Sequence, residues 1–481
     1  MRARSWNRME SEMSGQAWRM QLSGFLETLS WRDVPEGVRE QAHYVLMDTM
    51  GAVLAGAMEP EYQAIGRRMV ETSQGASTAM GFPQGVAAGT AAFLNGMAGT
   101  FLEMDEGHRV ARGHPAVHVL PAVWAEAEQR GASGTDVLLA LIAGYEACAR
   151  LGAAARLRAQ MHPHGTWGVL GAAVGVGKLR GYDADRLGRL INVASSLTLA
   201  TSKRTMLEGA TVRNAYAGVA NQLGLLAADL VDSGFTGERE GVETVFGSVV
   251  SEVFDADAMV GGLGERWEIM HNYFKQHACC RYAHGALDAL EAILAEQGNL
   301  SPDEIDGIEV RTYQLAAELD SRFPDSMLAG KFSIPFALAT RLVTGSSGVA
   351  SFTAEAVRDE RALALARRVT VVEDPALTAR LPQQRPAQVS VRIGGRHLRA
   401  EVTYNHGDDV HPYTRVELEQ KFEALALRAL PSGTVPALRD ALLGFSNLDA
   451  VASLQPILRS ARNAEIIPPG GAHPPPGRTE A

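Results

Sequence analysis

Five of the chain's 13 histidines fall between positions 108 and 164, and the first of them lie in a segment rich in carboxylates. This segment, LEMDEGHRVARGHP, covers residues 102–115 and contains Asp105, His108 and His114. An imidazole beside a carboxylate is suited to acid or base catalysis near neutral pH, and loops on a rigid scaffold often carry such chemistry. The alternative interpretation is a charged surface loop without a catalytic role.

A second segment, MHPHGTWG over residues 161–168, places two histidines around Pro163, just before a stretch rich in Gly and Ala. A helix that begins here would point its first N–H groups at an anion, with His162 beside them. The His-x-His spacing also occurs in metal sites, but no HExxH motif or further ligand set completes one. We therefore expect this loop to face an anion rather than to hold a metal ion.

The third segment, YFKQHACCRYAH over residues 273–284, lies where the character of the chain changes. Lys275 and Arg281 are suited to binding carboxylates, because ammonium and guanidinium groups form charge-assisted hydrogen bonds with them. Junctions between domains are favoured ligand sites. The adjacent Cys279 and Cys280 are expected to be small buried apolar residues rather than nucleophiles.

One Gly-rich segment, GAAVGVGKL over residues 171–179, is expected to have no part in chemistry. A phosphate-binding loop needs Gly, four residues, and then Gly-Lys followed by Ser or Thr. Here Ala172 takes the place of the first Gly, and Leu179 takes that of the hydroxyl residue. The segment instead predicts a helix whose small residues allow a neighbouring helix to approach closely.

The composition argues against several classes of function. The 481 residues carry 55 acidic and 45 basic side chains, a formal net charge of −10, without any basic tract. Nucleic acid is therefore not an expected partner, and an anionic substrate needs a locally positive pocket. The three cysteines lack CxxC spacing and fit a reducing cytoplasm. Residues 1–20 lack the apolar core of a signal peptide, and polar residues interrupt the uncharged stretch 72–102, so no membrane span is expected.

The elements that must position these segments are helical up to about residue 263. The run TDVLLALIAGYEACA, residues 135–149, is apolar on nearly every face and predicts a buried core helix with Thr135 as its N-cap. Ala, Gly and Ser are abundant in the other predicted helices and would permit close packing. These helices cover residues 38–55, 87–102, 116–129, 185–198 and 215–232.

After about residue 300 the pattern changes to period-two alternation, which predicts strands in IDGIEVRTY, RRVTVVED and QVSVRIGG/RHLRAEVTY, with a hairpin turn at Gly394–Gly395. Helical periodicity returns near Val416. The expected fold is therefore mainly α with an α+β component, in which a smaller α/β domain is inserted before C-terminal helices. The expected boundaries are 20–270 for the all-α domain, 271–412 for the α/β domain and 413–460 for the returning helices, with flexible ends at 1–19 and 465–481.

Taken together, these segments resemble the MmgE/PrpD family. No single motif is very specific, but the order and spacing of seven motifs are, and they span about residues 20–450. The motifs are HP at His114, HPHGT at His162, a KxxxCCRxxH-like run at Lys275, GKFSIPFA at Gly330, LMDTMGAVLAG at Leu46, GFTG at Gly234 and VELEQKF at Val416.

The resemblance implies an all-α domain, a smaller α/β lid, a homodimer and a cofactor-free site between the domains. The family includes 2-methylcitrate dehydratase, cis-aconitate decarboxylase and iminodisuccinate epimerase. Asp105 falls in the family's acidic loop, His114 is its HP histidine, His162 matches the histidine of its HPxGT loop, and Lys275 matches the lysine that opens its lid segment.

The chain departs from the family pattern at three positions. Gly107 stands where members often carry a hydroxyl residue, and Arg213 and Tyr216 stand for the lysine and histidine of a K-x-L-H-x-G-x-A-A helix start. Arginine does not practically lose its proton, so Arg213 is expected to bind a carboxylate rather than act as a base. These departures argue against transferring the substrate of any one member.

The chemistry shared by these relatives forms or collapses a carbanion-like centre beside a carboxylate. It needs a base, a cationic clamp and an acid. The catalytic candidates are His162 and His114, either one as base and the other as acid, Asp105 to orient an imidazole, and Lys275 in the clamp. Closure of the lid would exclude water. The candidate substrate-binding residues are Arg213, Arg281, His108, Lys203, Tyr216 and His284.

The expected substrate is a small di- or tricarboxylate, and dehydration of the 2-methylcitrate type is the first choice because of the breadth of the family. Decarboxylation of cis-aconitate and epimerisation of iminodisuccinate are the alternatives within the family. A non-catalytic dicarboxylate-binding protein that retains the fold is a hypothesis from another class. A metal-dependent hydrolase is a third, which metal analysis and insensitivity to chelator would distinguish.

Overall fold

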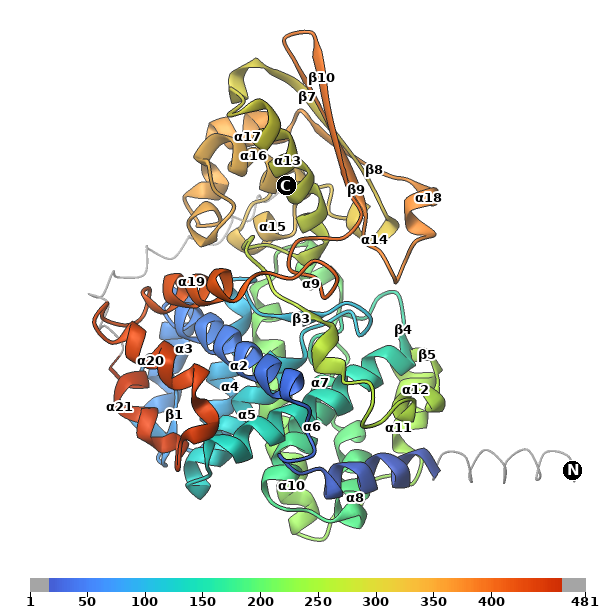
Figure 1. Ribbon diagram of the computed structural model, residues 1–481, viewed down its shortest axis with the longest axis vertical. Coiled ribbons are helices and arrows are strands. Elements are labelled where there is room, and N and C mark those ends of the chain that lie inside the picture. Colours follow the sequence, from blue (N-terminus) through green and yellow to red (C-terminus); the bar gives the residue numbers. More distant parts are fainter. Residues whose placement is uncertain (1–16, 461–481) are drawn as a thin grey trace, which may run out of the picture.

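The computed structural model describes residues 17–460. Helices fill one end of the long axis, and a sheet with its own helices forms the other (Figure 1). The predicted flexible segment 465–481 lies outside the described residues. For residues 17–19 the prediction of flexibility is wrong, because residues 17–28 are helical. There the buried Trp18 donates to Glu243 at 2.8 Å, and Arg19 forms an ion pair with the same carboxylate at 2.5 Å.

The helical part is built from long central helices with short ones around them. Its long elements are α2 (Glu36–Gly56), α3 (Pro60–Val70), α4 (Ala88–Phe101), α5 (Pro115–Arg130), α6 (Gly134–Ala154), α7 (Gly168–Leu179), α8 (Ala184–Ser196) and α10 (Tyr216–Asp232). Its short elements are β1 (Ser77–Thr78), β2 (Gly85–Val86), β3 (Gly107–His108), β4 (Ala155–Leu157), α9 (Arg204–Leu207), α11 (Gly241–Thr244), β5 (Ser251–Phe254), α12 (Ala256–Val260) and β6 (Asn272–Tyr273).

Helix α6 is the core helix predicted from the apolar run 135–149. It is long and apolar enough to cross a membrane by length and composition, but 89% of its most apolar window is buried inside the protein, as in a core helix. Its N-cap is Ser133 rather than the predicted Thr135. Ser133 and Asp136 form a reciprocal capping box, which satisfies two N–H groups of the first turn.

Helix α7 contains the Gly-rich segment 171–179 and packs between α6, α5 and α10. The prediction of a small-residue helix interface is confirmed. A Cβ atom added at Gly144 of α6 would lie 2.6 Å from the carbonyl oxygen of Gly171, and one added at Gly171 would lie 2.5 Å from Cβ of Cys148. Glycine is needed here because the two helix backbones approach more closely than a side chain would allow.

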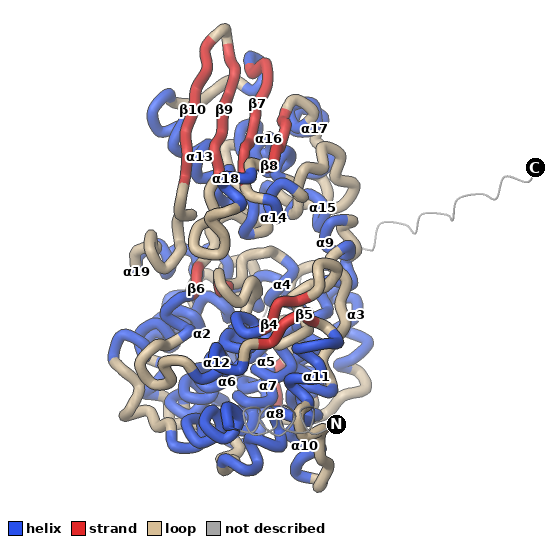
Figure 2. The backbone as a smooth tube through the Cα atoms, turned by 90° about the vertical axis from the view of Figure 1, so that its right-hand side faces the viewer, coloured by secondary structure: helices blue, strands red, loops and turns tan. Residues whose placement is uncertain are grey.

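The sheet part runs from α13 to β10 and has four strands in the order β10-β9-β7-β8, which lie side by side in Figure 2. Strands β7 and β8 are parallel, and the other two pairs are antiparallel. Helices α13 and α16 pack against the sheet. The predicted fold class, mainly α with an α+β component, is therefore confirmed. The elements are α13 (Arg281–Gln297), β7 (Ile305–Thr312), α14 (Gln314–Ala317), α15 (Met327–Lys331), α16 (Ile334–Thr344), α17 (Glu360–Ala366), β8 (Val369–Glu373), α18 (Pro375–Thr378), β9 (Ala387–Ile393) and β10 (Arg396–Val402).

The hairpin between β9 and β10 turns where the sequence predicts it. Ile393 pairs with Arg396, so Gly394 and Gly395 form a two-residue loop. Their φ angles are 52° and 74°, a left-handed conformation that two-residue hairpin loops favour and that glycine adopts without strain.

After the sheet part, the chain returns to the helical part through α19 (Arg415–Ala426), α20 (Val435–Leu443) and α21 (Gln455–Leu458). Helix α19 packs on α2 (Figure 1). The buried Lys421 of α19 donates to Asp48 of α2 at 2.5 Å and to the carbonyl of Met104 at 2.7 Å. The end of the chain thereby holds the polar segment 102–115 in place. Movement of the sheet part as a lid stays a prediction.

Candidate active site

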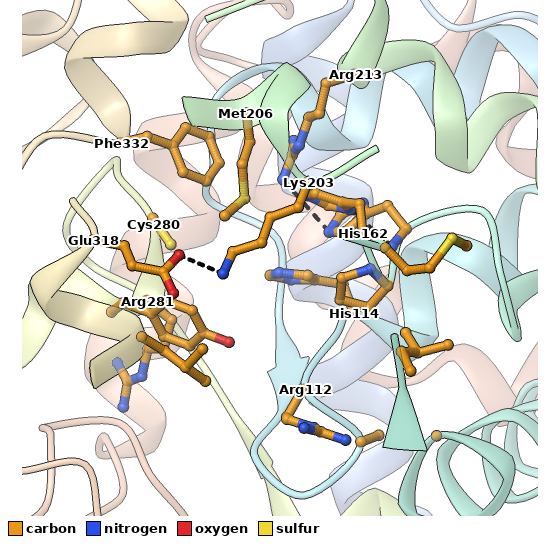
Figure 3. A pocket seen from close by; sticks show the side chains of 18 of the residues that line it. Arg112, His114, His162, Lys203, Met206, Arg213, Cys280, Arg281, Glu318 and Phe332 are labelled. Carbon is orange, nitrogen blue, oxygen red and sulfur yellow. Dashed lines mark hydrogen bonds and ion pairs between the residues drawn. The ribbon is translucent and has the colours of Figure 1, made fainter. Parts of the chain in front are cut away.

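A cavity of about 240 Å³ lies between the helical part and the sheet part. Pockets for drug-sized ligands have volumes of about 300–1,000 Å³, so this cavity suits a smaller molecule. His114, His162, Lys203 and Arg213 of the helical part and Glu318 of the sheet part point toward it (Figure 3). Its polar lining consists of Glu103, Arg112, His114, Arg158, His162, His164, Lys203, Arg213, Tyr273, Arg281, Tyr282, Gln314, Glu318 and Arg385.

The loop between α4 and α5 supplies the first wall. Glu103 and Arg112 have φ angles of 53° and 57°, a left-handed conformation that is uncommon for residues other than glycine. Each such residue costs about 1–3 kcal/mol and persists only where its surroundings hold it, a condition often met at functional sites. The loop ends at His114, the N-cap residue of α5. The backbone therefore holds a carboxylate and an imidazole at fixed positions.

Asp105 and His114 form a buried pair at the end of this loop. Nδ1 of His114 lies 3.0 Å from Oδ2 of Asp105 and 2.6 Å from the carbonyl oxygen of Glu106. Nδ1 therefore carries a proton that it donates to the Glu106 carbonyl, and the Asp105 carboxylate lies at ion-pair distance from the ring. Nε2 is the ring nitrogen left without a partner among the described residues. Burial acts to raise the pKa of Asp105, but the nearby His114 and Lys275 outweigh it and hold this pKa well below its usual range. The pair is suited to exchanging a proton at Nε2.

Asp105 also belongs to a buried network of four charged side chains, together with Glu103, Arg213 and Lys275. Arg213 pairs with Glu103 at 2.5 Å. Lys275 lies 3.4 Å from Glu103 and 3.3 Å from Asp105, and its side chain is fully buried. Burial acts to lower the pKa of Lys275, but Asp105 and Glu103 raise it above its usual value. Lys275 and Arg213 are thus each paired with protein carboxylates, and the formal charges of the four groups sum to zero.

The 161–168 segment brings His162 to the same side of the cavity as His114 (Figure 3). The N–H of His162 donates to the carbonyl of Thr201, and the Thr201 hydroxyl donates to the carbonyls of His162 and His164. Nδ1 of His162 accepts the N–H of His164 at 2.9 Å, so the neutral ring carries its proton on Nε2. Burial, reinforced by the charge of Arg213, holds the pKa of His162 well below its usual value. His162 is therefore a neutral N–H donor.

Two more histidines pack against these rings. His118 is satisfied at both nitrogens, because Nδ1 donates to the carbonyl of His114 and Nε2 accepts the N–H of Gly165. It therefore links the two loops rather than facing the cavity. His164 lies between the rings of His114 and His162, with its centroid 4.7 and 4.8 Å from theirs, and its Nε2 faces Arg213 at 3.4 Å.

Two more of the predicted substrate-binding residues line the cavity, and both are already paired with carboxylates. Lys203 lines the cavity and forms an ion pair with Glu318 of the sheet part (Figure 3). Arg281 also lines it, but its guanidinium donates to Asp408 at 2.6 Å and to Nδ1 of His284 at 3.0 Å.

The structure does not bring His108, His284 or Tyr216 into the cavity wall. His108 lies 3.3 Å from Glu268 and accepts the N–H of Ala111. His284 is fully buried behind Arg281, and its Nε2 donates to the carbonyl of Cys279. The Tyr216 ring lies edge-on to the His162 ring, with centroids 6.1 Å apart. Cys279 and Cys280 are buried, as predicted, although Cys280 also contacts the cavity.

The structure gives a physical reason for Gly107. Strand β3 pairs with β6, which sets Gly107 opposite Tyr273. A Cβ atom at position 107 would lie 2.4 Å from the Tyr273 hydroxyl oxygen and 2.5 Å from Cζ. The glycine therefore makes room for a phenol at the cavity wall, where the family often has a hydroxyl side chain in the loop itself.

Sequence reasoning missed four residues of the site: Glu103, His164, Tyr273 and Arg385. Glu103 was one carboxylate among several in a polar loop, and His164 was noted only as part of a possible metal motif. Arg385 lies in LPQQRPAQ, whose composition indicates nothing but a loop. The described residues contain no group of three or more His, Cys, Asp or Glu side chains placed to hold a metal ion.

The sequence is similar to known proteins over most of its length. The MmgE/PrpD N-terminal domain matches residues 20–257, and the MmgE/PrpD C-terminal domain matches residues 277–441. A cis-aconitate decarboxylase of Aspergillus terreus is 25% identical, with 93% of this chain and 97% of the relative covered. Human cis-aconitate decarboxylase is also 25% identical, with 89% and 92% covered. A cis-aconitate decarboxylase-like protein of Aspergillus oryzae is 23% identical, with 90% and 95% covered. The chain belongs to the MmgE/PrpD family of enzymes.

Proposed function

We propose that the protein removes CO₂ from a small unsaturated tricarboxylate of the cis-aconitate type. The observation that carries the proposal is the Asp105–His114 pair, which leaves one imidazole nitrogen free at a cavity of suitable size. The names of the relatives support decarboxylation, and for this reason the proposal replaces dehydration of 2-methylcitrate as the first choice. A homodimer and a cytoplasmic location stay predictions.

In the proposed reaction, the bond between a methylene carbon and its carboxylate breaks and CO₂ leaves. The electron pair of that bond forms a new double bond to the central carbon. The pair of the original double bond moves to the carbon beside another carboxylate, and that carbon takes a proton. The reaction therefore needs a proton donor at one carbon and stabilisation of negative charge next to it.

We assign the proton to Nε2 of His114 in its doubly protonated form, which the Asp105 carboxylate stabilises. His162 would donate its Nε2–H to the carboxylate on which charge develops, because its neutral ring is fixed in that tautomer. Lys275 and Arg213 would hold Asp105 and Glu103 in place rather than clamp the substrate. In this assignment His114 is the acid, and His162 is a hydrogen-bond donor.

Proton NMR in deuterated buffer tests the function, with cis-aconitate, 2-methylcitrate, citrate, malate and aspartate-derived acids as candidate substrates. From cis-aconitate we expect a product with two vinylidene proton signals and one deuterium in its new methylene group. Exchange or water loss in 2-methylcitrate alone would support dehydration instead. Absence of exchange with every acid, for folded protein, would support the binding-only hypothesis.

Replacing His162 by alanine is expected to abolish measurable turnover of cis-aconitate while the protein stays folded. Loss of a donor to developing charge lowers turnover by about 10²–10³-fold in well-studied sites, and the cavity left by the ring would admit water. The measurement is turnover, with circular dichroism to check the fold. His397→Ala in the exposed β9–β10 hairpin is the matched control. Near-normal turnover of His162→Ala would contradict the assignment.

A further inference from the structure

The cavity must supply positive charge to hold a polycarboxylate, yet most of its cations are already paired. Arg213 pairs with Glu103, Lys203 with Glu318, and Arg281 with Asp408. A cation that already has a carboxylate partner attracts a second carboxylate weakly, because the two opposite charges largely cancel. The clamp expected from the sequence is therefore mostly neutralised.

Three arginines of the cavity wall form no ion pair with a described residue: Arg112, Arg158 and Arg385. Arg112 and Arg158 are exposed to solvent. Arg385 is different, because only 4% of its surface is exposed. Within residues 17–460, its guanidinium donates one hydrogen bond, from Nη2 to the carbonyl of Arg109 at 2.7 Å. Its other donors have no protein acceptor in that range.

Aromatic rings hold this guanidinium at the cavity. Its central carbon lies 5.3 Å from the ring of Tyr282 and 6.0 Å from the ring of Tyr273. The Tyr273 ring lies 6.2 Å from the ring of His114, so one side chain connects Arg385 with the proposed proton donor. A buried guanidinium without a counter-ion is costly, and a carboxylate from the ligand would remove that cost.

We propose that Arg385 anchors one carboxylate of the substrate through a charge-assisted, bidentate hydrogen bond. The inference rests on the proposed function in assuming a polycarboxylate. It adds to that function a residue of the sheet part that selects substrates with an additional carboxylate. This residue is far in sequence from the catalytic loops. Arg385 thereby determines specificity, whereas His114 and His162 act on the reacting atoms.

The test measures binding of an inert probe, propane-1,2,3-tricarboxylate, and of its two monoamides by calorimetry. We expect Arg385→Gln to weaken binding of the tricarboxylate by about 10- to 100-fold, the effect of losing a hydrogen bond between charged groups. One of the monoamides should bind wild type and Arg385→Gln with similar affinity, because it lacks the carboxylate that Arg385 holds. Arg380→Gln, which removes an exposed arginine of the sheet part paired with Glu401, is the matched control.

The three ligands separate anchoring from a structural role. Equal weakening of all three by Arg385→Gln would show that the variant only distorts the site and would overturn the proposal, as would unchanged binding of the tricarboxylate. If Arg385→Gln does not fold, Arg385→Lys carries the test, with a smaller loss expected for the same ligands. Failure of the wild-type protein to bind any of the three acids would instead count against the proposed function.

Discussion

Replacing His114 by glutamine is expected to lower turnover of cis-aconitate by about 10²–10⁴-fold, the usual contribution of a positioned acid or base. The glutamine amide has hydrogen-bonding groups for Asp105 and the carbonyl of Glu106, but it has no proton to transfer at the cavity. Binding of propane-1,2,3-tricarboxylate should change little, since His114 does not supply the carboxylate anchor. Initial rates and calorimetry on the same preparation measure the two quantities.

His397→Gln makes the same chemical change at an exposed position and should leave both quantities unaltered. Two outcomes would contradict the role given to His114. One is turnover within tenfold of wild type, which would mean that another group delivers the proton. The other is a loss of probe binding as large as the loss of turnover, which would make the imidazole a binding group.

Replacing Asp105 by asparagine is expected to reduce turnover by about 10⁴-fold, as seen when the carboxylate that orients a catalytic imidazole is made neutral. The change removes the charge that stabilises the protonated ring. It also allows the NH₂ group of the asparagine, instead of an oxygen, to face Nδ1. Initial rates with cis-aconitate measure this loss.

The same substitution should destabilise the fold, because it leaves Lys275 and Arg213 with Glu103 as their only carboxylate in the four-residue network. Breaking a buried ion pair in this way costs about 3–5 kcal/mol, measured as the free energy of unfolding in urea. Glu103→Gln is the informative comparison. It removes a carboxylate from the same network but leaves the Asp105–His114 contact intact, so it should lower stability similarly and turnover less. Equal loss of turnover in both variants would make the role of Asp105 structural.

Elements with strong local signals were predicted closely from the sequence. The core helix predicted from the apolar run 135–149 lies within α6, because its apolar spacing is a local property. The β9–β10 hairpin has its turn at the predicted glycines for the same reason. The N-cap of α6 was misassigned because both Ser133 and Thr135 are suitable residues, and only the position of Asp136 decides between them.

The residues of the site were predicted less completely, because the direction of each loop side chain decides whether it lines the cavity. His108 and His114 belong to one segment, yet the pairing of β3 with β6 directs His108 toward Glu268, away from the cavity. Lys275 and Arg213 were recognised as cations, but the carboxylates that neutralise them come from the loop after α4. Arg385 follows His114 by more than half of the chain's length, and no local pattern connects two positions so far apart.

The hydrogen bonds of Lys421 to Asp48 and to the carbonyl of Met104 have a consequence for folding during synthesis. A ribosome releases α2 and the 102–115 loop long before it has polymerised α19, and domains generally fold from the N-terminus as they emerge. Until α19 arrives, Asp48 lacks its buried partner and the apolar side of α2 that α19 covers is open to water. We therefore expect a chain that ends before Arg415 to expose the side of α2 that α19 covers and to aggregate more readily than the full chain.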